Sequence, residues 1–278
     1  MKFVRFRHQN QIWIGSLGTP SNPQDTATIS GCSPNPLLTQ LDPQAKPLPS
    51  EKSVAVADVQ LLAPVTGSRK IVCVGRNYAA HAQEMGSEVK ELPVIFNKFP
   101  TAIANPSDDI LLPSISEQVD YEAELVVVIG KPGKNIPREN AWQHVLGFCC
   151  GNDVSARDWQ KGRPGGQWLL GKTFDGFAPI GPWLVTPDEV DPENLDIQLR
   201  LNGQQMQMSN TKKLIFPIDF LISHISKFCT LETADLLFTG TPEGVGAGRT
   251  PPVFLRHGDV TEVEIAGIGT LNNRFTQN

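Results

Sequence analysis

Residues 119–130 read VDYEAELVVVIG and constrain the fold more than any other stretch of the chain. Leu125, Val127 and Ile129 occupy one face of the expected strand, and Val126 and Val128 occupy the other. A strand that is apolar on both faces is typical of the interior of a layered domain, where other elements cover it above and below. The stretch therefore predicts a buried strand around which the rest of the chain is organised.

Two acidic residues interrupt this apolar pattern. Glu122 and Glu124 are two positions apart, so their side chains point to the same face of the strand, about 6.6 Å apart at the backbone. A buried carboxylate takes up a proton or finds a partner, and a bound divalent cation would serve both groups. Oxygen ligands with no Cys or His pair nearby favour Mg²⁺, Mn²⁺ or Ca²⁺ over zinc and copper. The alternative is an exposed edge strand with solvated glutamates.

Composition excludes several classes of protein. The 278 residues are 40% hydrophobic and 19% charged, which is enough for one large domain with a small appendage. A net charge of -5, without a cluster of Lys and Arg, argues against nucleic acid or an anionic membrane as a partner. No apolar segment approaches the roughly 18 to 20 residues that a membrane-spanning helix needs.

The N-terminus and the cysteines predict a cytoplasmic protein. Residues 1–15 interleave charges with apolar residues and lack the unbroken apolar region of a signal peptide. The five cysteines are an odd number, and Cys149 and Cys150 are adjacent, a geometry in which a disulfide is strained. We interpret them as small buried residues in a reducing compartment.

The N-terminal part of the chain predicts a small β-rich module. Residues 3–16 alternate between polar and apolar and predict a β-hairpin. Residues 33–50 contain five prolines and few large apolar residues, which is typical of a loop or linker. A short element at 54–62 leads into the main domain. We therefore expect a module with a Pro-rich linker at 1–62 and one main domain at 63–278.

Further polar residues lie at positions that suit chemistry. A helix expected to begin at position 79 carries His81 and Glu84, three residues apart on one face. Asp153 follows an apolar strand and a Gly-Asn pair, where it is either a third metal ligand or a helix cap. Lys172 lies among Leu and Phe residues, which favours a position facing a pocket. The alternative for His81 and Glu84 is a solvated helix pair.

The C-terminal third predicts a hairpin, a helix and a glycine-rich loop. Asn202-Gly203 is a type I′ turn signal between strands expected at 194–201 and 204–208. Residues 217–228 have helical spacing. The loop TGTPEGVGAG contains four glycines, which permit close approach of the backbone to a ligand. One or two alternating strands end the chain.

Eight segments of the chain resemble the fumarylacetoacetate hydrolase family, in its acylpyruvase-like branch. They occur in order over about residues 70–275, and so specific a series identifies the main domain. The segments are VGRNYAAHAQEMG, PVIFNKFPTAI, DYEAELVVVIG, GNDVSARDWQ, LLGKTFDGFAPIGPW, LIFPIDFLISHIS, LLFTGTPEGVG and GDVTEVEIAGIGTLNNRF. The resemblance implies an α+β fold, a mixed β-sheet roll of the C-terminal domain type of that family. It also implies a homodimer that binds one Mg²⁺ or Mn²⁺ per subunit, with Ca²⁺ also accommodated.

The resemblance also assigns roles to individual residues. The expected metal ligands are Glu122, Glu124 and Asp153. The expected catalytic residues are His81, Glu84 and Lys172. The expected substrate-binding residues are Arg76, Tyr78, Lys98, Arg157, Gln160 and Thr241. One departure is Ala80, where many relatives have an acidic residue before the helix histidine.

The implied substrate is a small 2-oxo acid, which chelates the metal through a carboxylate oxygen and the keto oxygen. The first expectation is hydrolysis of a C–C bond in an acylpyruvate such as fumarylpyruvate, with His81 deprotonating a water, or decarboxylation of oxaloacetate. Both pass through an enolate that the metal with Lys98 or Lys172 would stabilise. The alternatives are a tautomerase or isomerase of oxaloacetate or a 2-hydroxy-dienoate, and a lyase or dehydratase of a ureido or sugar acid.

Overall fold

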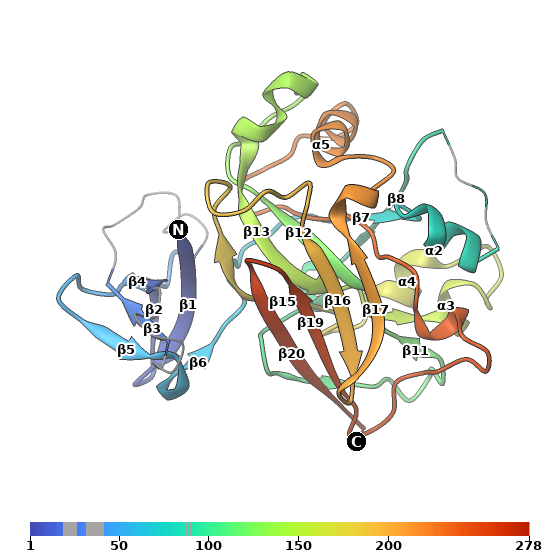
Figure 1. Cartoon of the computed structure of the whole chain (residues 1–278), viewed down its shortest axis with the longest axis horizontal. Helices are drawn as coiled ribbons and strands as arrows, with labels where there is room; N and C mark the ends of the chain where they lie inside the picture. The colour runs from blue at the N-terminus through green and yellow to red at the C-terminus, as the bar shows by residue number, and fades with distance from the viewer. Residues whose placement is uncertain (19–26, 32–41, 87, 89–90, 278) are drawn as a thin grey trace.

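The structure, a computed structural model, describes residues 1–18, 27–31, 42–86, 88 and 91–277. Two large sheets dominate these residues, with four short α-helices around them (Figure 1). The α-helices are α2 (Ala79–Glu84), α3 (Arg157–Gln160), α4 (Trp168–Lys172) and α5 (Ile218–Ser226). The 3₁₀ helices are η1 (Val56–Asp58), η2 (Pro100–Ala102), η3 (Arg138–His144), η4 (Thr211–Lys213) and η5 (Gly246–Gly248). The expected α+β mixed β-roll is confirmed.

The larger sheet has thirteen strands within the described ranges and contains both parallel and antiparallel pairs. Its main path runs β5-β3-β2-β1-β15-β13-β12-β18-β7-β8, with β4, β6 and β9 attached at the side. The strands are β1 (Lys2–His8), β2 (Gln11–Leu17), β3 (Thr28–Ser30), β4 (Lys46–Pro47), β5 (Ser53–Ala55), β6 (Gln60–Leu61), β7 (Ile71–Gly75), β8 (Val94–Lys98), β9 (Ile103–Ala104), β12 (Ala123–Ile129), β13 (Val145–Asn152), β15 (Ala178–Val185) and β18 (Leu236–Phe238).

The second sheet packs against the first. It has the order β10-β20-β19-β16-β17, and its strands are β10 (Asp109–Leu111), β16 (Asp196–Leu201), β17 (Gln204–Asn210), β19 (Val260–Ile265) and β20 (Gly269–Thr276). Asn202 and Gly203 connect β16 to β17, both with positive φ, so the predicted turn is confirmed. A separate pair joins β11 (Val119–Asp120) to β14 (Ser155–Ala156).

Strand β12 is buried on both faces, as its sequence predicts. Leu125, Val127 and Ile129 belong to the apolar core that includes residues of the second sheet, and Val126 and Val128 belong to a second core on the other side. Each buried Val, Leu or Ile side chain contributes about 1.5–3 kcal/mol. This double burial makes β12 a rigid support for the acidic residues at its start.

The predicted strand through residues 119–130 is broken where those acidic residues begin. Strand β11 ends at Asp120 and β12 begins at Ala123, so Glu122 lies between them. The backbone N–H of Glu122 donates to the side-chain Oδ1 of Asn152, at 2.9 Å, and not to a neighbouring strand. The chain changes partner here, because β11 pairs with β14 whereas β12 pairs with β13.

The N-terminal module contains the predicted hairpin, β1 and β2, but its Pro-rich segment differs from the expectation. Within the described residues 42–50, β4 pairs with β2, Leu48 is buried, and Asp42 forms an ion pair with Arg5 at 2.5 Å. This part is packed because its few apolar side chains cover the hairpin. Residues 33–41 of the predicted linker lie outside the described residues.

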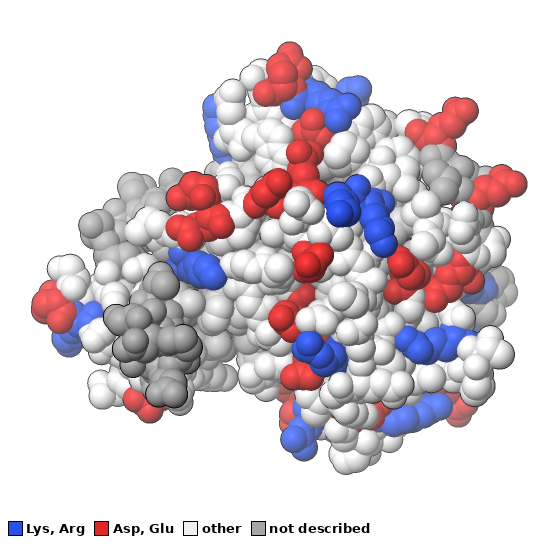
Figure 2. All heavy atoms as spheres, in the orientation of Figure 1, with Lys and Arg blue, Asp and Glu red and all other residues white. Residues whose placement is uncertain are grey.

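The charges on the visible face are mixed in sign, and the cysteines that the structure describes are unpaired. On the face shown in Figure 2, Lys and Arg side chains are interspersed with Asp and Glu, and no extended basic surface is present there. No helix within the described ranges is long and apolar enough to cross a membrane. Cys73, Cys149, Cys150 and Cys229 are all free thiols.

Candidate active site

Three carboxylates meet where β12 begins and β13 ends. Glu122 precedes β12, Glu124 lies within it, and Asp153 directly follows β13. The antiparallel pairing of Ala123 with Asn152 brings these ends together. One oxygen atom from each carboxylate lies within 4.8 Å of the other two, and all three residues are buried. The structure therefore brings the three predicted metal ligands together, and Asp153 caps no helix.

The electrostatics of this triad fit a cation. Burial raises the pKa of Glu124 well above its usual range, and the nearby carboxylates of Asp153 and Glu122 raise it further. Its only hydrogen bond among the described residues comes from the Gly240 backbone N–H, at 2.7 Å. Asp153 Oδ1 is buried and accepts no hydrogen bond of good geometry. A cluster of three buried carboxylates, in which Glu124 has no cation partner among the described residues, suits a hard divalent cation.

Lys172 neutralises part of the triad from the cavity side. Its Nζ lies 2.6 Å from Glu122 Oε2, 2.8 Å from Asp153 Oδ2 and 5.0 Å from the centre of the Phe96 ring. Burial alone would lower its pKa, but Asp153 and Glu122 outweigh this and raise it. The lysine is therefore a cation in the cavity, as its apolar sequence neighbours predict.

Lys98 lies behind the triad. Its Nζ is 2.6 Å from Asp153 Oδ1 and donates to the backbone carbonyl oxygens of Val154, at 3.0 Å, and Phe177. An ammonium group has three N–H donors, so two are used by these carbonyls and the charge faces Asp153. Lys98, like Asp153 itself, does not line the cavity that His81, Glu122 and Glu124 share. Its position suits the holding of Asp153 more than contact with a substrate.

Arg157 connects the triad to a buried anchor. Its guanidinium lies 2.8 Å from Asp120 Oδ2 and 2.7 Å from Glu122 Oε1. Lys172 and Arg157 together outweigh the effect of burial and hold the pKa of Glu122 well below its usual range. Asp120 also accepts the backbone N–H of Gly246, at 2.7 Å. Asp120 thereby fixes both Arg157 and the glycine-rich loop.

His81 and Glu84 form a pair on α2. His81 Nδ1 lies 3.3 Å from Glu84 Oε2, and Glu84 Oε1 accepts the backbone N–H of Gly244, at 2.9 Å. Burial raises the pKa of Glu84, but these hydrogen bonds outweigh it and lower the pKa overall. Nε2 of His81 has no hydrogen-bond partner among the described residues. A histidine held through Nδ1 by a carboxylate presents Nε2 as a base.

The remaining predicted residues separate into two groups. Arg76, Gln160 and Thr241 line the same cavity as His81, Glu122 and Glu124. Gln207 Nε2 donates to Thr241 Oγ1 at 2.8 Å, so the Thr241 hydroxyl proton is free to point elsewhere. Tyr78 is buried, at 1% exposure, and is absent from the cavity wall.

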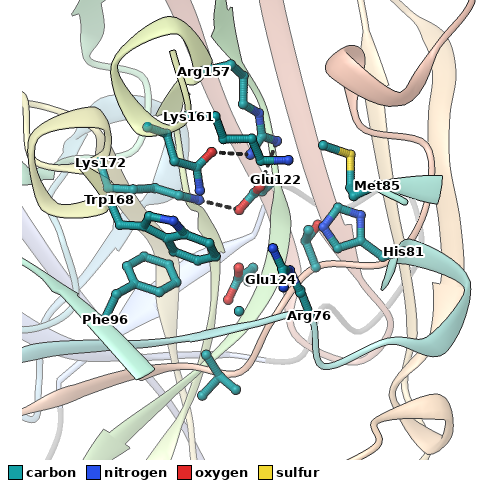
Figure 3. Close-up of a pocket in the computed structure, with 14 residues that line it drawn as sticks. Arg76, His81, Met85, Phe96, Glu122, Glu124, Arg157, Lys161, Trp168 and Lys172 are labelled. Atoms are coloured by element: carbon teal, nitrogen blue, oxygen red, sulfur yellow. Dashed lines mark hydrogen bonds and ion pairs between the residues drawn. The ribbon is translucent and has the colours of Figure 1, made fainter. Parts of the chain in front are cut away.

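The cavity is small: the volume open to the centre of a water molecule is about 30 Å³, within about 400 Å³ of space between the walls that includes open solvent. Figure 3 shows that His81, Glu122 and Lys172 project into it from different elements, with Trp168 and Phe96 on one side. A base, two carboxylates of the triad and several cations thus line one small cavity. This arrangement can bind an anionic chelating molecule and move a proton on it.

Several residues of the site were not found from the sequence. Asp120 lies directly beside the predicted acidic pair, and its place in the same acidic motif was the available signal. Trp168 and Lys161 also line the cavity. Lys161 precedes and Trp168 follows a glycine-rich stretch, residues 162–166, without a recognisable pattern, so no local signal marks either residue.

The fold and the site together define an enzyme built on the fumarylacetoacetate hydrolase fold. The family model described as Fumarylacetoacetate (FAA) hydrolase C-terminal matches residues 70–276, and one described as Rv2993c-like, N-terminal, matches residues 1–64. The chain belongs to the fumarylacetoacetate hydrolase family.

Named relatives within the family catalyse more than one reaction. Over 218 residues the chain is 52% identical to "Oxaloacetate tautomerase fahd2, mitochondrial" of Xenopus laevis, covering 78% of this chain and 68% of the frog protein. The crystal structure of 2-hydroxyhepta-2,4-diene-1,7-dioate isomerase from Mycobacterium marinum matches with a TM-score of 0.84 and 35% identity, covering 100% of this chain and 99% of that one. Fumarylpyruvate hydrolase from Pseudomonas aeruginosa, in complex with Mn²⁺ and pyruvate, matches with a TM-score of 0.69 and 37% identity, covering 79% and 92%.

Proposed function

We propose that this protein catalyses keto–enol tautomerisation of a small 2-oxo dicarboxylate such as oxaloacetate, with Mg²⁺ or Mn²⁺ bound by Glu122, Glu124 and Asp153. One observation carries the proposal: His81, held through Nδ1 by Glu84, lines the same cavity as Glu122 and Glu124, whose carboxylate oxygens lie within 4.8 Å of each other and of Asp153. Tautomerisation needs one base beside the carbon next to the ketone and stabilisation of negative charge on the enolate oxygen. The site contains both.

Each residue has a role in this reaction. A bound divalent cation would supply the positive charge that polarises the keto oxygen. His81 Nε2 removes the proton from the carbon next to the ketone, and the resulting imidazolium gives a proton to the enolate oxygen, which completes the enol; the reverse reaction uses the same two transfers. Glu84 stabilises the imidazolium that forms. Lys172 keeps Glu122 and Asp153 in place, and the free hydroxyl proton of Thr241 can hydrogen-bond a carboxylate oxygen of the substrate.

The comparisons support the proposal at the level of chemistry. The frog relative is named as an oxaloacetate tautomerase, and the mycobacterial structure is titled an isomerase of a dienedioate. Both names describe movement of a proton and a double bond in a dicarboxylate that has an oxygen beside one carboxylate. The expected decarboxylation of oxaloacetate would pass through a different enolate, that of pyruvate, formed when the remote carboxylate leaves as CO₂, and the same positive charges would stabilise it.

A second candidate is hydrolysis of an acylpyruvate. It is favoured by the similarity to fumarylpyruvate hydrolase, whose structure holds Mn²⁺ and pyruvate. In that reaction His81 would deprotonate a water, which would attack the carbonyl remote from the chelated end. The sugar-acid and ureido-acid reactions find no support in the named relatives above. The homodimer, the cytoplasmic location and the boundary between residues 62 and 63 stay predictions.

Product analysis separates these reactions. Purified protein is freed of metal with a chelator, reloaded with Mg²⁺ or Mn²⁺, and mixed separately with the enol form of oxaloacetate and with fumarylpyruvate. We expect the ultraviolet absorbance of the enol to decay faster than in buffer, without pyruvate or CO₂, and only after reloading. Release of pyruvate from fumarylpyruvate at a much higher kcat/KM would favour the hydrolase. Full activity in excess chelator would refute the metal requirement.

A further inference from the structure

The cations of the cavity divide into two groups by what they contact. Arg157 and Lys172 form ion pairs with Glu122 at 2.7 and 2.6 Å. Arg76 and Lys161 line the same cavity, but neither has a carboxylate partner among the residues that the structure describes. Two positive charges in one small cavity repel each other unless an anion lies between or beside them. The second group is therefore incomplete without an anionic ligand.

The backbone conformation at Arg76 and a contact with Trp168 hold the Arg76 side chain at the cavity. Arg76 follows β7 with a φ of 61°, a left-handed conformation that costs a non-glycine residue free energy. Its guanidinium lies over the Trp168 ring, 5.7 Å from the ring centre. The Trp168 ring in turn fits against Gly75, where an added Cβ would lie 2.9 Å from it. Trp168 and the strained backbone thus hold the guanidinium at the cavity wall.

Lys161 approaches from another element. It directly follows α3, and its side chain reaches the rim of the cavity. In Figure 3 its amino group projects from beside Arg157 into the space between the two walls. Burial of part of the side chain lowers its pKa, and the positive charges of Arg157 and Arg76 lower it further. An anion bound beside Lys161 would stabilise its charged form and offset the effects that lower its pKa.

We propose that Arg76 and Lys161 bind the second carboxylate of the substrate, the one remote from the keto group, and so select 2-oxo dicarboxylates over 2-oxo monocarboxylates. This inference rests on the proposed function for its substrate class. The carboxylate and keto oxygens beside each other would lie at Glu122, Glu124 and Asp153. A planar guanidinium offers two parallel N–H donors to the remote carboxylate, and Lys161 offers a point charge.

The difference between paired and unpaired cations explains why the cavity has more positively charged side chains than its own carboxylates pair with. Arg157 and Lys172 are engaged by the protein, so they balance the triad whether or not a substrate is present. The charges of Arg76 and Lys161 remain for the ligand. A substrate that ends in a methyl group at this position would leave both cations unpaired, which is the basis of selection against it.

Binding of two non-reacting ligands tests this inference without relying on turnover. Malate and 2-hydroxybutanoate both offer a hydroxyl beside a carboxylate, but only malate has a second carboxylate, where the other has a methyl group. Their affinities for the Mn²⁺-loaded protein are measured by calorimetry. We expect malate to bind at least tenfold more tightly, because a hydrogen bond to a charged group is worth about that factor or more.

The variants Arg76→Gln and Lys161→Gln should each lower the affinity for malate by about tenfold and leave the affinity for 2-hydroxybutanoate unchanged within twofold. Arg163→Gln is the matched control, since it removes the same charge two positions away from Lys161. The Arg163 side chain stacks over Trp159, 4.6 Å from the ring centre, and does not line the cavity. Melting temperatures of all variants show whether they are folded.

Three outcomes would overturn the inference. The first is that the parent binds malate and 2-hydroxybutanoate with equal affinity. The second is that the Arg76 and Lys161 variants lose affinity for both ligands equally, and the third is that Arg163→Gln loses as much affinity for malate as Lys161→Gln does. If malate selection and its loss are observed while oxaloacetate is not tautomerised, the subsite stands and the proposed reaction falls.

Discussion

Gly248 is the residue whose substitution most sharply tests the catalytic role of Glu84. A Cβ added at Gly248 would lie 2.4 Å from Glu84 Cδ, 2.5 Å from Cγ and 2.7 Å from Oε1, whereas ordinary contacts begin near 3.4 Å. Gly248→Ala must therefore displace the carboxylate by about 1 Å, the difference between 2.4 and 3.4 Å. The glycine has no positive φ, so its backbone tolerates alanine.

The size of the effect follows from this displacement. A shift of about 1 Å in a group that orients a catalytic residue can cost roughly 100-fold in rate. Glu84 would lose its hydrogen bonds to Gly244 and His81, so the imidazole would lose its orientation. We expect kcat for enol decay to fall about 100-fold in Gly248→Ala, and Mn²⁺ affinity to stay within twofold of the parent.

A double-mutant cycle shows whether Gly248 acts through Glu84. If it does, adding Gly248→Ala to Glu84→Ala costs nothing further, because the displaced group is already absent. Gly18→Ala is the control, since its added Cβ would meet only ordinary contacts, the nearest at 3.5 Å. A Gly248→Ala variant with parental kcat, or a full additional loss in the Glu84→Ala background, would refute the reasoning.

Lys98→Met should lower the stability of the metal-free protein by about 1–3 kcal/mol, measured by urea unfolding, because the buried Oδ1 of Asp153 would lose its cation and only the Lys172 contact at Oδ2 would remain; an unchanged midpoint would contradict the role given to Lys98. Since hydrogen bonds lower the pKa of Glu84, its stabilising effect is complete above its ordinary value of 4.5 and is lost as the pH falls through the lower folded pKa. Glu84→Gln should therefore flatten that acid limb of the stability profile, and an unaltered limb would count against the hydrogen bonds. Glu124→Gln should raise the melting temperature of the metal-free protein at neutral pH and weaken Mn²⁺ binding, because the raised pKa of Glu124 means that folding must either bury its charge or take up a proton, and glutamine avoids both costs; a lower melting temperature would exclude this explanation.

Local sequence was sufficient for the elements that carry the site. The apolar pattern on both faces of residues 125–129 predicted a buried strand. The Asn202-Gly203 pair predicted the hairpin of β16 and β17. Carboxylates in so apolar a segment predicted a shared partner, and the structure brings Glu122 and Glu124 together with Asp153. The strand and the hairpin were predictable because each rests on spacing within one strand or turn, whereas the role of the three carboxylates as metal ligands stays a prediction.

Features that depend on distant partners were not accessible from the sequence. The break at Glu122 arises because β11 and β12 pair with different strands, which alternation alone does not reveal. Lys98 was expected to contact substrate, whereas carbonyl groups supplied by later parts of the chain hold it behind Asp153. The fit of Glu84 against Gly248 likewise joins residues from separate elements.

The most direct test of the central claim is the rate of oxaloacetate enol decay in the His81→Ala variant, measured beside its Mn²⁺ affinity. We expect that the metal-loaded parent accelerates the decay and that His81→Ala lowers kcat by roughly two to four orders of magnitude, the range for loss of a general base. Mn²⁺ affinity should stay within twofold, because His81 is not among the three carboxylate ligands. Parental kcat in His81→Ala, with Mn²⁺ bound, would contradict the claim that this histidine moves the proton.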